Sequence, residues 1–64
     1  MIQTAYVDSA NWLKARLDNG LEQNIAYNVQ LQGFTSSGVT YKDTDGWIKL
    51  WHENGFIENI NYVG

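Results

Sequence analysis

The sequence repeats itself with a period of 35 residues, so that 4–29 aligns on 39–64 without a gap. Nine of the 26 aligned positions are identical, where chance alone would give about one or two. The identical pairs are Tyr6/Tyr41, Asp8/Asp43, Trp12/Trp47, Lys14/Lys49, Asn19/Asn54, Gly20/Gly55, Asn24/Asn59, Ile25/Ile60 and Tyr27/Tyr62. We interpret the pattern as an internal duplication within a single domain, 1–64.

Each repeat has the pattern of a strand followed by a helix. Residues 2–7 are rich in apolar and β-favouring types, which predicts a strand. Asp8 and Ser9 suit a helix N-cap, because their side-chain oxygens accept hydrogen bonds from free backbone amides. A helix is therefore expected at about 10–18, ending at Gly20, where glycine can take the left-handed conformation.

A second strand is expected at 24–32. Four apolar residues alternate there with polar ones, which is the period of a strand with one buried face. The Gly-rich and Ser-rich segment 33–38 predicts a turn. The second repeat then predicts a strand at 39–41, a helix at about 45–53 and a strand at 57–63.

The expected order, βαββαβ, favours an α+β fold built from two β-α-β halves. It resembles the ferredoxin-like two-layer sandwich, with a four-stranded antiparallel sheet and both helices on one face. In the strand order 4-1-3-2 that this resemblance implies, strand 24–32 is an outer strand. The expected core places Trp47, Ile48, Leu50 and Trp51 of the second helix against Ile25, Tyr27, Ile60 and Tyr62 of the sheet.

Composition argues against several classes of function. The 64 residues include no Cys and one His, so neither a disulfide nor a metal site is expected, and no cofactor is implied. A net charge of −3 with four scattered basic residues makes direct nucleic-acid binding unlikely. No phosphate loop, nucleophile elbow or metal motif is present, so we expect no enzyme. No signal peptide or membrane span is evident, so a cytoplasmic protein is expected.

The candidate partner-binding residues lie mainly in a stretch without charge. No charged residue occurs from 23 to 41, and uncharged surfaces rich in amides and aromatics suit protein contacts. Arg16 joins this group because it stands where the second repeat has Trp51. The partner-binding candidates are Asn28, Gln30, Gln32, Phe34 and Arg16.

A second candidate surface is acidic. Acidic surfaces can steer a protein toward basic sites on a partner. The carboxylates expected on the helical layer are Asp8, Asp18, Asp43, Asp45 and Glu53. Asp8 and Asp43 are interpreted as helix caps rather than as an acid–base pair. His52, the only imidazole, is interpreted as structural or exposed.

These observations predict a small, acidic, non-catalytic binding protein that acts by stoichiometric protein–protein interaction. In size and character the chain resembles the small phage-encoded inhibitors of host machinery, anti-CRISPR proteins among them. The alternative is a small-ligand-sensing regulatory module resembling ACT domains. Strand 24–32 has neither Lys nor Pro to protect its edge, so a homodimer paired antiparallel through that edge is expected.

Overall fold

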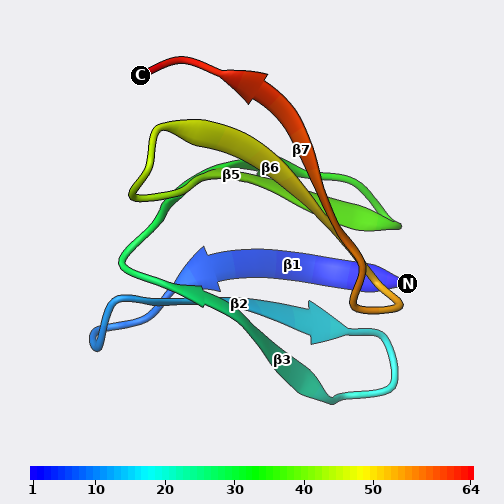
Figure 1. Cartoon of the computed structure of the whole chain (residues 1–64). Helices are drawn as coiled ribbons and strands as arrows, with labels where there is room; N and C mark the ends of the chain where they lie inside the picture. The colour runs from blue at the N-terminus through cyan, green and yellow to red at the C-terminus, as the bar shows by residue number, and fades with distance from the viewer.

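The computed structural model describes residues 1–64 and contains strands but no helix (Figure 1). The first sheet, sheet I, has the strand order β1-β2-β3, and the second, sheet II, has the order β4-β5-β6-β7. All pairings are antiparallel and join strands that follow each other in the chain. The strands are β1 (Ile2–Val7), β2 (Trp12–Leu17), β3 (Glu22–Tyr27), β4 (Gln30–Phe34), β5 (Gly38–Lys42), β6 (Trp47–His52) and β7 (Ile57–Tyr62).

The two expected helices are wrong, and with them the ferredoxin-like α+β fold. The segment expected as the first helix contains β2, and the segment expected as the second contains β6. In β2, the apolar Leu13, Ala15 and Leu17 alternate with Trp12, Lys14 and Arg16, which is the period of a strand. Pairing on both sides satisfies the backbone of β2, while a helix of about nine residues is marginal by itself.

The expected strand 24–32 is also wrong as a single element. It is divided into the end of β3 and the start of β4 by a turn at Asn28, whose φ is 60°. The Asn28 amide donates to the carbonyl oxygen of Asn11 at 2.7 Å, which fixes this turn against the loop between β1 and β2. The chain thereby leaves sheet I and enters sheet II, so β3 and β4 are outer strands of different sheets.

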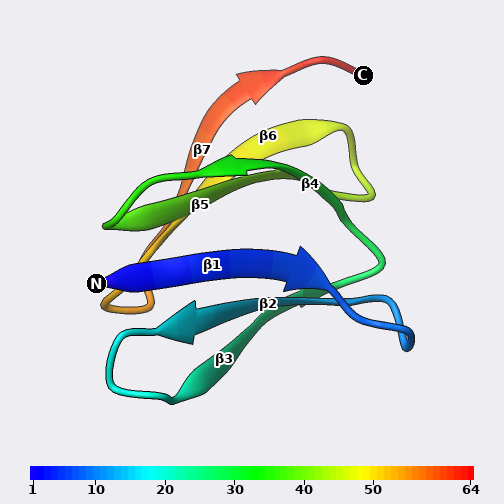
Figure 2. The ribbon, with the colours of Figure 1, turned by 180° about the vertical axis from the view of Figure 1, so that it is seen from behind.

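Figures 1 and 2 show sheet I below sheet II, and β1 of sheet I lies against β4 of sheet II. The core lies between the sheets and contains side chains from both. It comprises Ile2, Ala5, Leu13, Ala15, Leu17, Val39, Tyr41 and Trp51. Of the core expected from the sequence, Trp51 is buried and Ile25 packs half-buried against the core. The rest of that expectation is wrong, because Ile60, Tyr62 and Tyr27 are exposed and Trp47, Ile48 and Leu50 are half-buried.

The strands follow the 35-residue period. β2 and β6 start and end 35 residues apart, as do β3 and β7. The β2–β3 pairing shifts register between Leu13 and Lys14, and the β6–β7 pairing shifts at the equivalent residues, Ile48 and Lys49. Strand β4 has no counterpart in sheet I, so the two sheets are three-stranded and four-stranded forms of one repeated unit.

Candidate interaction surface

An aspartate holds the turn before β2 in sheet I and the equivalent turn before β6 in sheet II. Asp8 Oδ1 accepts a hydrogen bond from the amide of Trp12 at 2.9 Å, and Asp43 Oδ1 accepts one from the amide of Trp47 at 3.0 Å. Each carboxylate also accepts the amide two residues ahead of it. The side chains thus fold the backbone locally, as the cap prediction required of them, but they close β-turns instead of starting helices.

The same carboxylates form ion pairs with a lysine of the strand that follows the turn. Asp8 Oδ2 lies 3.1 Å from Lys14 Nζ, and Asp43 Oδ2 lies 2.7 Å from Lys49 Nζ. The amide of Trp12 is the main cause that lowers the pKa of Asp8, whereas the Lys49 hydrogen bond is the main cause for Asp43. The partner carboxylate raises the pKa of each lysine. Asp8 and Asp43 therefore have a structural role, and the ammonium groups of Lys14 and Lys49 neutralise their charges.

A second polar group lies on the side of sheet I that faces away from the core. Glu22 accepts hydrogen bonds from the Tyr6 hydroxyl and from Arg16, the latter at 3.0 Å. These two bonds lower the pKa of Glu22, with the Tyr6 bond as the larger cause. The bond to Glu22 in turn raises the pKa of Tyr6. Arg16 is thus part of a network on its own sheet and stands apart from the neutral segment.

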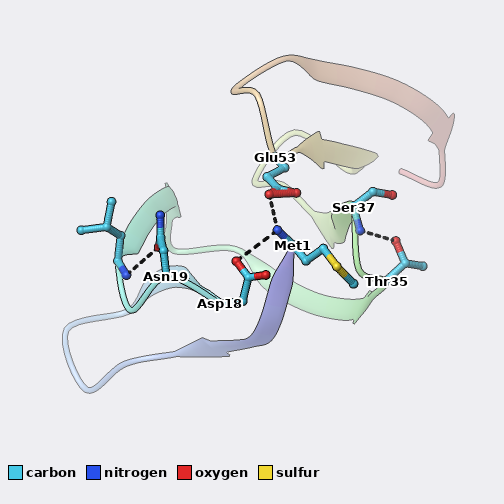
Figure 3. Close-up of polar contacts among 7 residues, drawn as sticks. Met1, Asp18, Asn19, Thr35, Ser37 and Glu53 are labelled. Carbon is cyan, nitrogen blue, oxygen red and sulfur yellow. Dashed lines mark hydrogen bonds and ion pairs between the residues drawn. The ribbon is translucent and has the colours of Figure 1, made fainter.

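The five acidic residues do not form the continuous charged layer that the helical fold implied, since that layer does not exist. Asp18 and Glu53 both contact the N-terminal ammonium of Met1 (Figure 3). With Asp8 and Asp43 held by lysines, only Asp45 has no cationic partner within salt-bridge distance. Four of the five carboxylates are therefore in ion pairs within the molecule.

The residues expected to bind a partner lie in three places. Gln30, Gln32 and Phe34 are exposed on β4, Asn28 lies in the turn before it, and Arg16 lies on sheet I. Asn28 and Gln30 line a pocket of about 300 Å³ together with the turn that contains Asp43. All eight residues lining that pocket are polar or glycine, and the structure brings no group of three or more His, Cys, Asp or Glu together as a metal site.

The surface of β7 was not predicted from the sequence. Every residue of this strand is exposed, and β7 is the outer strand of sheet II. Large apolar side chains are concentrated here, with Ile60 53% and Tyr62 58% exposed. We use the name apolar strip of β7 for the exposed large apolar residues of this strand and of the two positions that flank it, which are Phe56, Ile57, Ile60, Tyr62 and Val63. Its signal in the sequence was the replacement of Glu22 by Ile57 at equivalent positions of the repeat.

The apolar strip of β7 is firmly positioned by β6. Tyr62 pairs with Trp47 across the two strands, with ring centroids 5.1 Å apart, and the equivalent Trp12–Tyr27 pair in sheet I has a centroid distance of 5.3 Å. Cross-strand aromatic pairs of this kind stabilise the outer strand of a sheet. The strip is therefore presented on a paired strand, with its outer backbone edge unoccupied.

The structure has no helix that is long and apolar enough to cross a membrane. Comparison of the chain with protein-family models, curated proteins and solved structures finds no match.

Proposed function

We propose that this protein is a non-catalytic binding protein that acts by stoichiometric contact with a protein partner. The observation that carries the proposal is the apolar strip of β7, which combines exposed Ile and aromatic side chains with an unpaired strand edge. Exposed large apolar side chains favour protein contacts, and an open edge can add a strand from another chain. Neither Lys nor Pro interrupts Ile57–Tyr62 to prevent such pairing.

This mode of action gives the partner both backbone and side-chain contacts. The β7 edge offers N–H and C=O groups, and side chains such as Ile60 and Tyr62 supply apolar area beside them. The acidic surface contributes less to this proposal, because four of its five carboxylates are engaged inside the molecule. Inhibition of a larger machine, as in phage-type inhibitors such as anti-CRISPR proteins, is one form that such surface masking takes. The ACT-like alternative was derived from the ferredoxin-like fold and has lost that basis.

The homodimer expected through 24–32 is a separate prediction. The β3 part of that segment is an outer strand of sheet I, and the β4 part is an outer strand of sheet II that lies next to β1. β3 exposes fewer large apolar residues than β7, with Tyr27 at 56% and Ile25 half-buried. We therefore assign the partner contact to β7 and use β3 as the comparison.

The test compares lysine substitutions on the two outer strands. Candidate partners are captured from a lysate with the parent protein, purified, and titrated by calorimetry for stoichiometry and affinity. Ile60→Lys on β7 should abolish binding of the purified partner, and Asn24→Lys on β3 should leave it unchanged, both variants having melting curves that show a folded protein. Equal binding by Ile60→Lys and the parent would overturn the assignment to β7.

A further inference from the structure

The two sheets pack with opposite faces of the repeated unit. Sheet I turns Ala5, Leu13 and Ala15 toward the core, and all three are buried. Their equivalents in sheet II are Thr40, Ile48 and Leu50, which are only half-buried and lie on the side of sheet II away from the core. The core contact is therefore a head-to-tail contact between two similar units, not a pairing of identical faces.

The reverse comparison gives the same result. Sheet II turns Val39, Tyr41 and Trp51 toward the core. Their equivalents in sheet I are Thr4, Tyr6 and Arg16, which lie on the side away from the core and are half-buried or exposed. We call the Thr4 side of sheet I the head face, and the Ile48 side of sheet II the tail face. The head face of sheet I is equivalent to the face that sheet II buries in the core. The tail face of sheet II is equivalent to the face that sheet I buries there.

The two open faces carry matching polar replacements. On the head face, the Arg16–Glu22 ion pair stands where sheet II has Trp51 and Ile57. On the tail face, His52 and Glu58 stand where sheet I has Leu17 and Gln23, and His52 Nε2 lies 2.9 Å from Glu58. The core residues Trp51 and Leu17 are thus replaced on the open faces by Arg16 and His52, each of which lies beside a carboxylate.

The polar pairs lie at corresponding ends of their faces. Within the molecule, Met1 contacts both Asp18 and Glu53, so the end of β2 lies beside the end of β6 (Figure 3). Repeating that arrangement brings the His52 end of one tail face beside the Arg16 end of a head face on another copy. Arg16 then meets the carboxylate of Glu58, while Ile48 and Leu50 cover Thr4 and Tyr6.

We propose that copies of this chain associate head to tail, the tail face of one copy packing on the head face of the next as sheet I packs on sheet II. Stacking of repeated units buries faces that one unit leaves open, which is how repeat proteins and β-propellers are built. A contact of this type joins copies into a ring where the rotation closes. It uses the sheet faces and leaves the β7 edge free, so it is independent of the proposed partner contact.

The test uses two variants, each with one defective face. Ile48→Lys places a charge on the tail face, and Thr4→Lys places one on the head face, both at half-buried positions. The native mass of each is measured alone and as an equimolar mixture, with Gln3→Lys, an exposed position on β1, as the control. Circular dichroism of each variant establishes whether it is folded. If a lysine variant is unfolded, Thr4→Ser replaces Thr4→Lys, and Ile48→Val replaces Ile48→Lys.

The parent and Gln3→Lys should form particles heavier than one chain, and each face variant should be monomeric alone. The mixture should form a dimer of one copy of each, because each variant keeps one intact face. A monomeric parent overturns the proposal. So does a Thr4→Lys protein that dimerises alone, since that result shows identical tail faces pairing with each other. If Thr4→Ser and Ile48→Val are used instead, each variant should assemble more weakly than the parent. Assembly equal to that of the parent overturns the proposal.

Discussion

The carboxylate of Asp43 connects the backbone of its turn to Lys49, whose ammonium lies 2.7 Å away. Asp8 and Lys14 repeat this arrangement 35 residues earlier at 3.1 Å. One side chain thereby fixes both the turn and the strand that follows it. The conserved spacing within each unit is explained by this contact, which requires an acid before the turn and a lysine two residues into the strand.

Acidification should destabilise the protein through these two aspartates. Their pKa values are lowered in the folded state, so their stabilising contribution is complete above the ordinary carboxyl pKa and is lost as the pH falls through the folded-state pKa. The melting temperature of the parent should fall as the pH is lowered below about 4. Asp43→Asn keeps an oxygen acceptor for the turn but removes the titration, so its melting temperature should be lower at neutral pH and change less on acidification.

Asp45→Asn is the control for that experiment, because it removes one negative charge two residues away without touching the Asp43 contacts. Its acid dependence should follow that of the parent more closely. An Asp43→Asn protein with the same pH profile as the parent would contradict the role given to Asp43.

Equivalent apolar positions should differ in their contribution to stability. Leu13 is fully buried in sheet I, and its equivalent, Ile48, is half-buried on the tail face of sheet II. Leu13→Ala should cost about 2–5 kcal/mol, because it removes buried contacts and leaves a cavity. Ile48→Ala should cost clearly less in the monomer, as measured by urea denaturation at low protein concentration. Equal losses would mean that Ile48 is covered within the single chain.

The tryptophans of β6 offer a second comparison. Trp51 is 5% exposed in the core, whereas Trp47 is half-buried beside Tyr62. Trp51→Ala should cost about 3–5 kcal/mol, which is a large part of the free energy of unfolding of a small domain. Trp47→Ala should leave a folded protein with a lower melting temperature and a weakened β6–β7 contact. A greater loss for Trp47→Ala than for Trp51→Ala would contradict the position of the core.

Gly46 should be more sensitive to substitution than Gly20. Both have positive φ, at 91° and 89°, where an added side chain costs about 1–2 kcal/mol. A Cβ on Gly46 would also lie 2.4 Å from the carbonyl carbon of Gly64, while one on Gly20 would meet nothing within 4 Å. Thermal denaturation should show a larger loss for Gly46→Ala than for Gly20→Ala, and deletion of Gly64 should recover part of it.

Local signals in the sequence identified the repeat and the element ends at Asp8, Gly20, Asp43 and Gly55. They identified neither the turn at Asn28 nor the type of the segment after each Asp. The cap residue and the closing glycine are shared by short helices and by β-hairpins, because both need an acceptor for free amides and a residue with positive φ. The decisive signal was the alternation in Trp12–Leu17, which is short and contains only three buried side chains. In Trp47–His52 the alternation is obscured, because both faces carry apolar residues.

The candidate surface was harder to predict for a different reason. Ile60 is 53% exposed, while its equivalent Ile25 is half-buried and packs against the core, although both lie on outer strands. Identical residues at equivalent positions thus have different surroundings, and only the three-dimensional order of the units distinguishes them. The sequence indicated an unprotected outer strand but placed it at 24–32, where a turn at Asn28 interrupts it.

The pairing of every strand with its neighbour in the chain has a kinetic consequence. Each ladder grows outward from a short turn, so the backbone contacts have low contact order, and the loop that must close before each pairing is small. The chain has no proline and no cysteine to add a slow isomerisation or disulfide step. Refolding should therefore be rapid and single-exponential for an all-β protein, with the docking of the two sheets as its last event.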